Sequence, residues 1–428
     1  MDLDAYMKKI ELELLVIGEE NWWAKIASIG TPLKIDLKNG KTDLIFLWRK
    51  QETQPKHSAV YLDINGVINH HNFTPAQLLR YKNTDVYYYI CQADSTWNGT
   101  YALIPVPDNV IQPTYHGDLQ QQINQHRQWI MKRRAYHSAD PLNKINLPHT
   151  RWGEMHSRIY LDPSIIHSSW ASYDQNSIDS VGLSPCQSHT YESTRLQQNR
   201  RFWTYSTAQN TDYDIPIVIL LDGEFWVESI PVMSALDHCT ENKQLPPAVY
   251  IMIDAISFQQ RANDLPCNTT FWQAVIEEIL PIVAEQYPIS ADRKKTIIAG
   301  QSFGGLSALY AVLNWPERFG NAIVQSGSFW WPEDTLIHQS HRNKAAPSQP
   351  NSLYIERYIS SQHDNSQINI FMEVGKREGM MVPLSHHIHR NLTKANYQVR
   401  LQEYDGGHDR LIWREGLIKG LIWLTNKF

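Results

Sequence analysis

The feature that most constrains the fold is an alternation in the C-terminal half of the chain. From about residue 200 onward, short apolar runs are separated by segments with the apolar spacing of amphipathic helices. The runs include 214–223, 247–256, 296–300 and 321–327. Strands that are apolar along their whole length, with helices between them, form a parallel sheet buried on both faces. We therefore predict an α/β domain whose ligands bind at the carboxyl ends of the strands.

The sequence before this region has a different texture. Residues 1–30 have an amphipathic helical pattern, and short β-rich runs follow with Asn-Gly turn signals at 65–66 and 98–99. Repeated short strands with turn signals between them are typical of an antiparallel sandwich. The β-rich runs cover residues 44–49, 59–64, 85–93 and 100–106.

The length of the chain also indicates more than one domain. One hydrophobic core rarely grows beyond about 250–300 residues, and this chain has 428. Residues 107–195 are rich in Pro, His, Ser, Asn and Gln, which is typical of a long, partly ordered connection. We predict a sandwich-like domain with a leading helix over 1–150, a linker over 151–190, and the α/β domain over 191–428.

A G-x-S-x-G motif at 300–304 lies between the apolar run 296–300 and an apolar helical stretch over 303–314. In this setting the serine occupies a strained turn from a strand into a helix, with its hydroxyl exposed. The two glycines remove side chains that would clash in that turn. The free N–H groups and the dipole of the helix face a reacting carbonyl. We therefore predict an α/β-hydrolase serine esterase with Ser302 as nucleophile and the amide of Phe303 as an oxyanion-hole donor.

His408 occupies the position expected for the general base. In α/β-hydrolases the chain order is serine, acid, histidine, and His408 lies after the last predicted strand and before the last helix. Glycines at 406 and 407 let the backbone bring the imidazole close to its partner. We predict that His408 removes the proton of Ser302.

The acid of the triad is expected between these two residues. Glu378 follows the strand 367–375 by three residues, where a triad acid projects, and it is our first choice. Asp405, which flanks the histidine, is the alternative, and a Ser–His dyad without an acid stays open. Such an acid holds the imidazole tautomer and stabilises the imidazolium.

A second oxyanion-hole donor is expected in the loop after the strand 214–223. The backbone of 223–225 is the candidate, and we name the amide of Glu224 within it. The alternative is a simple turn in which Asp222 caps a helix.

Composition excludes several other classes of protein. The net charge is −5 and the sequence has no basic run of five residues, so no nucleic-acid partner is expected. The sequence has no apolar stretch of 18 residues, so no membrane span is expected. The N-terminus lacks the features of a secretory signal, and the four cysteines are too widely spaced for a disulfide scaffold or a zinc site. These features favour a reducing cytoplasm; the oligomeric state stays open.

Several long stretches resemble the enterochelin (ferric enterobactin) esterase family. In the first half, a looser likeness covers residues 98–105 and 139–143. The specific likeness covers nearly the whole second half. Its stretches are 220–229, 245–256, 260–272, 299–320, 325–332, 373–381 and 405–422.

The resemblance implies a cytoplasmic enzyme that hydrolyses the serine ester bonds of a catecholate siderophore, apo or ferric, and so helps release its iron. No metal or organic cofactor is expected, since iron enters only as part of the substrate. Ser302, Glu378 and His408 match the serine, acid and base of the family. Some relatives have proline after the acid, whereas this chain has Gly379.

The resemblance also indicates residues that bind substrate. A ferric tris-catecholate carries about three negative charges, so we expect a locally basic site. Arg261 and Arg377 match the basic residues near the site in the family. Trp226, Trp330 and Trp331 follow strand ends and are candidates for stacking on catechol rings. For each of these residues, a packing or solvent-exposed role is the alternative.

Two other functions stay open at this stage. One is another carboxylic ester hydrolase that removes feruloyl or acetyl groups from carbohydrates, a function that a β-sandwich beside a hydrolase domain would suit. The other is a siderophore-binding protein without catalysis, against which the intact Ser302–His408 pair argues.

Overall fold

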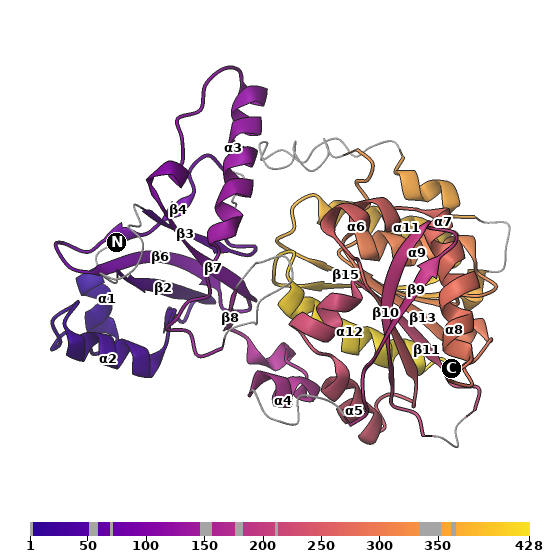
Figure 1. Cartoon of the computed structure of the whole chain (residues 1–428). Coiled ribbons are helices and arrows are strands. Elements are labelled where there is room, and N and C mark those ends of the chain that lie inside the picture. The colour runs from indigo at the N-terminus through magenta and orange to yellow at the C-terminus, as the bar shows by residue number, and fades with distance from the viewer. Residues whose placement is uncertain are drawn as a thin grey trace. The chain divides into compact units, whose positions relative to one another are not determined.

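The computed structural model describes residues 3–50, 59–68, 72–145, 156–175, 183–209, 213–333, 352–360 and 365–428. The chain forms two compact units, which are shown in Figure 1. One comprises Met1–Ser164 and Asp405–Leu411, and we call it the N-terminal unit. The other comprises Ile165–Tyr404 and Ile412–Phe428, and we call it the hydrolase unit.

The N-terminal unit contains two four-stranded sheets, in the orders β1-β2-β6-β5 and β4-β3-β7-β8. Neighbouring strands are antiparallel throughout both sheets. The strands are β1 (Leu33–Asp36), β2 (Lys41–Arg49), β3 (Ala59–Ile64), β4 (Ala76–Gln77), β5 (Leu79–Arg80), β6 (Val86–Asp94), β7 (Asn98–Val106) and β8 (Ser157–Tyr160).

Strand β2 shows why these residues form a sandwich. Leu44 and Phe46 enter a core that they share with residues of β3 and β7, whereas Ile45 and Leu47 enter a second core with the first two helices. Successive side chains of a strand point to opposite faces, so one apolar strand serves both cores. The predicted sandwich is confirmed, and helices cover its outer faces.

Among its described residues, this unit has the α-helices α1 (Leu3–Lys9), α2 (Glu20–Ile29) and α3 (Leu119–Arg133). Helix α3 lies within the predicted connection 107–195, and a capping box at Asp118 begins it. Its Trp129 packs edge-on against Tyr61 of β3. The turn predicted at 98–99 is wrong, because both residues belong to β7.

The hydrolase unit contains an eight-stranded sheet in the order β16-β15-β14-β13-β11-β12-β10-β9. The six strands from β12 to β16 in that row are parallel, and β10 and β9 are antiparallel additions at one edge. The predicted mainly parallel sheet is confirmed. The strands are β9 (Gln187–Ser193), β10 (Gln198–Ser206), β11 (Ile217–Leu221), β12 (Val249–Ile253), β13 (Thr296–Gln301), β14 (Asn321–Gln325), β15 (Asn369–Gly375) and β16 (Gln398–Tyr404).

Helices cover both faces of this sheet (Figure 1), as a parallel sheet buried on both sides requires. Every residue of β11 and β12 is buried. The helices are α4 (Ala171–Asp174), α5 (Met233–Glu241), α6 (Phe258–Asp264), α7 (Thr269–Ala274), α8 (Leu280–Ala284), α9 (Phe303–Asn314), α11 (Met381–Lys394) and α12 (Arg410–Thr425). Helical segments with π geometry occupy Phe225–Ser229 and Val275–Ile279.

The boundary between the units differs from the predicted linker over 151–190. Residues 165–175 pack as part of the hydrolase unit, because Trp170 is fully buried there and Asp174 forms an ion pair with Arg414. The linker residues 151–155 and 176–182 lie outside the described residues.

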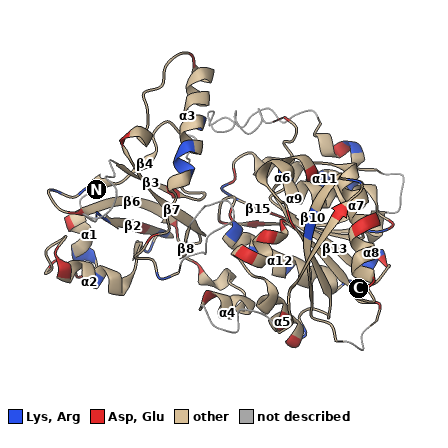
Figure 2. Ribbon diagram, viewed as in Figure 1, with Lys and Arg blue, Asp and Glu red and all other residues tan. Residues whose placement is uncertain are grey.

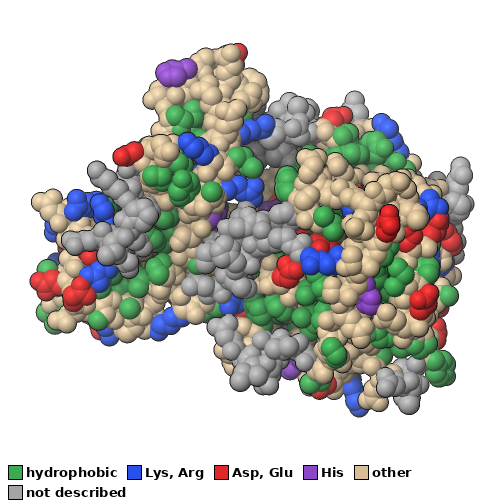
Figure 3. Space-filling view, in the orientation of Figure 1, with side chains coloured by type: hydrophobic (Ala, Val, Ile, Leu, Met, Phe, Trp, Pro, Cys, Tyr) green, Lys and Arg blue, Asp and Glu red, His purple; other side chains and the backbone are tan. Residues whose placement is uncertain are grey.

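Among the described residues, no helix is both long enough and apolar enough to cross a bilayer. All four cysteines carry free thiols. On the face shown in Figure 3, Lys and Arg side chains are dispersed among acidic and hydrophobic ones.

Candidate active site

Ser302 occupies a strained turn between β13 and α9. Its backbone angles are φ 57° and ψ −115°, a conformation that non-glycine residues rarely adopt. The Ser302 amide donates to the carbonyl of Gln325 at 2.9 Å, and its carbonyl accepts from the amides of Leu306 at 3.1 Å and Ser328 at 3.0 Å. These bonds from α9 and from the end of β14 hold the turn in place.

The two glycines of the motif have unequal roles. A Cβ on Gly300 would lie 2.3 Å from the carbonyl oxygen of Gly304, so a side chain at 300 cannot fit. A Cβ on Gly304 would meet only ordinary contacts, the nearest at 3.4 Å. The prediction that a side chain would clash at both positions therefore holds for Gly300 alone. Gly304 supplies the backbone atoms that a side chain at 300 would meet.

The hydroxyl of Ser302 has a partner that the sequence analysis missed. Its Oγ lies 3.1 Å from the Oγ of Ser328, which is buried just beyond β14. Ser302 itself is partly exposed, as a nucleophile must be, and Phe303 begins helix α9 directly after it. Amides at a helix N-terminus lack intrahelical partners, which suits the role expected for Phe303.

Glu378 is held by three donors that converge on its Oε1 atom. The hydroxyl of Ser326 and the amide of Gly375 each donate at 2.6 Å, and the hydroxyl of Tyr404 donates at 3.1 Å. The indole of Trp413 in turn donates to the hydroxyl of Ser326 at 3.0 Å. A carboxylate fixed in this way is suited to orient an imidazole. No motif or spacing in the sequence indicated a role for Ser326 or Tyr404.

Gly379 has a physical reason to differ from the proline of some relatives. Its φ of 57° lies in the left-handed region, which the ring of proline cannot adopt. The turn after Glu378 therefore excludes proline and favours glycine at this position.

His408 is exposed, and it belongs to the segment 405–411, which we call the His408 loop. This loop is part of the N-terminal unit, whereas Ser302 and Glu378 belong to the hydrolase unit. Asp405, the alternative acid, accepts a hydrogen bond at Oδ2 from Thr96 at 2.5 Å.

The loop after β11 places the second oxyanion candidate in a tight turn. Asp222 has φ 56°, and the amide of Phe225 donates to its carbonyl at 2.9 Å, which removes Phe225 from the candidates. Glu224 lies at the start of the helical segment that follows, where amides lack intrahelical partners. Its carboxyl is buried and accepts from the amide of Ala255 at 2.9 Å. Burial, and next the charge of Asp222, raise the pKa of Glu224 to about 8.

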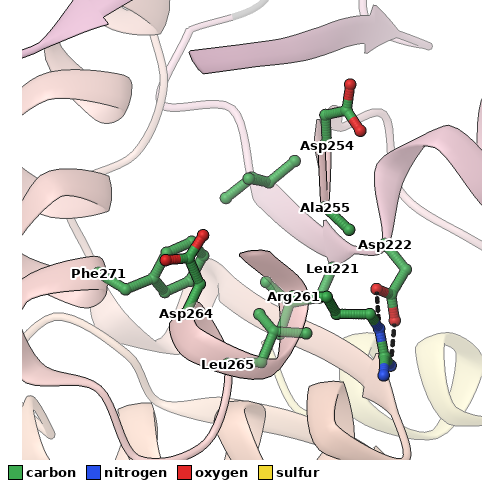
Figure 4. Close-up of a pocket in the computed structure, with 9 residues that line it drawn as sticks. Leu221, Asp222, Asp254, Ala255, Arg261, Asp264, Leu265 and Phe271 are labelled. Atoms are coloured by element: carbon green, nitrogen blue, oxygen red, sulfur yellow. Dashed lines mark hydrogen bonds and ion pairs between the residues drawn. The ribbon is translucent and has the colours of Figure 1, made fainter. Parts of the chain in front are cut away.

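Arg261 is engaged with the protein. Its guanidinium binds both carboxylate oxygens of Asp222, at 2.6 and 2.8 Å (Figure 4). It also donates to the carbonyl of Gln301 at 3.1 Å. Burial tends to lower the pKa of Arg261, and Asp222 outweighs this effect and raises it. Asp222 therefore balances the charge of Arg261, and the hydrogen bond to the carbonyl of Gln301 supports the residue before Ser302.

A pocket opens beside this ion pair at the carboxyl ends of β11 and β12. It is lined by Leu221, Asp222, Ile253, Asp254, Ala255, Arg261, Asp264, Leu265 and Phe271. Two of its acids are also paired, Asp254 with Arg201 and Asp264 with Arg200. The pocket wall therefore carries arginine–aspartate pairs in place of the unbalanced positive charge that the sequence analysis expected.

The other basic candidates differ in exposure. Arg377 is partly exposed in the loop that carries Glu378. By contrast, Arg414 of α12 is fully buried and paired with Asp174 and Glu415 in the hydrolase unit. Figure 2 shows Lys and Arg interspersed with Asp and Glu on the helices of this unit.

The three tryptophans also differ. Trp226 is fully buried and packs edge-on against Phe225, so the structure favours the packing interpretation for it. Trp330 and Trp331 are partly exposed. Trp330 lies with its ring centroid 5.5 Å from that of Phe303, beside the nucleophile. It is the better placed of the candidates for stacking on a ligand.

A mainly parallel sheet, with a serine on a left-handed strand-to-helix turn and an acid held after a later strand, defines a serine hydrolase of the α/β-hydrolase class. Residues 193–424 match the family described as "Putative esterase", and residues 43–170 match "Enterochelin esterase, N-terminal".

Relatives match along nearly the full length of the chain. The iron(III) enterobactin esterase of Dickeya dadantii is 37% identical over 95% of this chain and 93% of its own. The iron(III) enterobactin esterase of Escherichia coli K12 is 35% identical over 95% of this chain and 96% of its own. The crystal structure of the enterobactin esterase from Shigella flexneri in the presence of enterobactin has a TM-score of 0.79 and 33% identity, and it covers 96% of this chain and 99% of that one. The chain belongs to the enterochelin esterase family.

Proposed function

We propose that this chain is a serine esterase that hydrolyses the ester bonds of a catecholate siderophore such as ferric enterobactin. The observation that carries the proposal is the serine turn at 302 in a chain that matches iron(III) enterobactin esterases over 95% of its length. Opening the trilactone weakens chelation and so helps to release the iron. We place the enzyme in the cytoplasm, which its free thiols support.

The first half of the mechanism forms an acyl-enzyme. His408 takes the proton of the Ser302 hydroxyl, and the oxygen attacks the carbonyl carbon of a seryl ester. The amides of Phe303 and Glu224 stabilise the oxyanion, while Glu378 stabilises the imidazolium. As the tetrahedral intermediate collapses, the C–O bond to the leaving seryl oxygen breaks and that oxygen takes the proton from His408.

The second half hydrolyses the acyl-enzyme. His408 removes a proton from water, the hydroxide attacks the same carbonyl, and Ser302 leaves with the proton returned by His408. These steps need no metal or organic cofactor, and iron enters only as part of the substrate. Arg377, Trp330 and Trp331 are the proposed substrate-binding residues, and Arg261 contributes by supporting the turn at Ser302.

A feruloyl or acetyl esterase is the alternative function. Relatives named iron(III) enterobactin esterase match along almost the full chain at 35% and 37% identity, so the siderophore interpretation has the stronger support. The presence of the family's N-terminal region at 43–170 supports the same reading.

Product analysis tests the proposal. The purified protein, Ser302→Ala and the matched control Ser28→Ala are incubated with apo and ferric enterobactin, and the products are separated by chromatography. Ser28 is an exposed serine of α2, so its variant should behave like the wild type. We expect linear trimer, dimer or monomer from the wild type and the control, and none from Ser302→Ala. If the wild type hydrolyses feruloyl or acetyl esters and leaves both forms of enterobactin intact, the proposal is wrong.

A further inference from the structure

The His408 loop has an unusual place in the fold. It leaves β16 and runs into the start of α12. Residues 405–411 belong to the N-terminal unit, whereas β16 and the rest of α12 belong to the hydrolase unit. Contacts with residues of the first 164 positions therefore set the path of this loop. Three side chains of the sandwich, Asn65, Thr96 and Thr100, make these contacts, and we call them the anchor residues.

Asn65 binds the backbone of His408 itself. Its side-chain amide donates to the carbonyl oxygen of His408 at 2.8 Å. Asn65 is fixed in turn, because its amide N–H donates to the carbonyl of Thr100 at 2.9 Å and its carbonyl accepts from the indole of Trp97 at 3.1 Å. A donor held on both sides fixes the position of the group that it binds.

The approach at this point is close enough to require glycine in the loop. A Cβ on Gly407 would lie 2.1 Å from Oδ1 of Asn65 and 2.7 Å from the amide of Gly66. The residue before the histidine therefore packs directly against the turn that follows β3.

The two acids that flank His408 tie down the rest of the loop. Asp409 is buried, and its Oδ2 accepts from the amide of Thr100 at 2.7 Å and from its hydroxyl at 2.9 Å. Its Oδ1 accepts from the amide of Leu411 at 2.9 Å. On the other side, Asp405 accepts at Oδ2 from the hydroxyl of Thr96 at 2.5 Å. Anchors therefore lie before, at and after the histidine.

We infer that Asn65, Thr96 and Thr100 of the N-terminal unit are positioning residues for catalysis, which hold His408 in the geometry that proton transfer requires. This inference rests on the proposed function, in which His408 is the general base. The anchor residues act through the loop: Asn65 binds the carbonyl of His408, whereas Thr96 and Thr100 bind the side chains of Asp405 and Asp409.

Loss of an anchor should affect the chemical step and leave binding largely intact. A base displaced by about 1 Å can reduce a rate by as much as about a hundredfold, whereas groups that bind substrate elsewhere are unaffected. For Asn65→Ala we expect kcat for ferric enterobactin to fall about tenfold with KM within about twofold of the wild type. The matched control is Asn124→Ala, an exposed asparagine of α3 in the same unit whose side chain accepts from Gln120.

A second readout separates positioning from simple destabilisation. Fluorophosphonates label a serine that its base has activated, so the fraction labelled at completion counts folded sites and the labelling rate reports activation. We expect Asn65→Ala to reach full labelling at a rate lowered in parallel with kcat. A lower final extent, with a wild-type rate for the labelled fraction, would mean that Asn65 only stabilises the fold and would overturn the inference.

Thr100 gives a conservative test of the same idea. Thr100→Val removes the hydroxyl that binds Asp409 and keeps the shape, whereas Thr100→Ser keeps the hydroxyl. We expect kcat to fall several-fold in the valine variant and to be restored in the serine variant. Equal kcat values in the valine, serine and wild-type proteins would count against positioning.

The failures of the two proposals are distinguishable. If the wild type leaves enterobactin intact, or if Ser302→Ala still hydrolyses it, the proposed function with its serine nucleophile fails. If Ser302→Ala is inactive and both Asn65→Ala and Thr100→Val retain wild-type kcat and labelling rates, the esterase stands and the positioning role is wrong.

Discussion

The buried carboxyl of Glu373 leads to a specific prediction about how stability depends on pH. Glu373 lies on β15 with 2% of its surface exposed, and its Oε1 accepts from Nε2 of Gln325 at 2.6 Å. The same amide nitrogen donates to the carbonyl of Trp413 at 2.7 Å, and Oε1 of Gln325 accepts from Gln301 at 3.0 Å. This network links β13, whose last residue precedes Ser302, to β14 and β15.

Burial raises the pKa of Glu373 to about 8 from its ordinary value of 4.5, and the hydrogen bond from Gln325 only partly opposes this. Between these two values the folded protein binds a proton that the unfolded chain releases. Its contribution to stability is therefore full below about pH 4.5 and is lost as the pH rises through about 8.

The magnitude follows from this window. Each pH unit within it changes the free energy of unfolding by about 1.4 kcal/mol for one group, so Glu373 alone lowers stability by about 3 kcal/mol between pH 5.5 and pH 8. Glu373→Gln keeps the shape and an acceptor for Gln325, and it does not titrate. For a unit of this size, about 3 kcal/mol corresponds to roughly 8 °C in the unfolding midpoint of the hydrolase unit.

The assay is thermal unfolding followed by circular dichroism at several pH values from 5 to 8.5. We expect the midpoint of Glu373→Gln to move above that of the wild type as the pH rises. Glu241→Gln, which changes an exposed carboxylate of α5, is the matched control and should stay parallel to the wild type. Parallel curves for Glu373→Gln and wild type across the whole range would refute a buried carboxyl with a raised pKa.

Three further predictions follow from the contacts around the serine turn and from the thiols. Gly300→Ala should abolish turnover and lower the unfolding midpoint, because its Cβ would lie 2.3 Å from a backbone oxygen of Gly304; retention of both would contradict the turn geometry. Arg261→Ala should destabilise the protein by about 2–4 kcal/mol in denaturant unfolding, since it leaves Asp222 buried without its partner, and Arg261→Ala with Asp222→Asn should recover part of that loss. Burial raises the pKa of each of the four cysteine thiols to between about 11 and about 12, so alkylation by iodoacetamide at pH 8 should be slow in the native protein and fast in denaturant; rapid native labelling would contradict this burial.

Local patterns in the sequence predicted much of the fold. The apolar runs became β11 to β14 because the burial of a strand depends on its own residues, and α9 spans Phe303–Asn314 as its composition indicated. The turn at Ser302 was also predictable from local sequence, because the glycine that it requires, Gly300, lies two residues before the serine. Chain order also indicated Glu378, whose carboxylate the structure shows fixed by three donors.

The tertiary structure decided how distant residues combine. The sequence left two roles open for Trp226, stacking on a ligand or packing in the core, and the fold buries this side chain. Arg261 was predicted as a basic residue that binds substrate, and in the structure it is paired with Asp222, 39 positions away. The His408 loop belongs to the N-terminal unit through contacts with Asn65, 343 positions away. Periodicity and motifs report on neighbours along the chain, whereas ion pairs and anchors form between segments that only folding brings together, so their partners are set by packing.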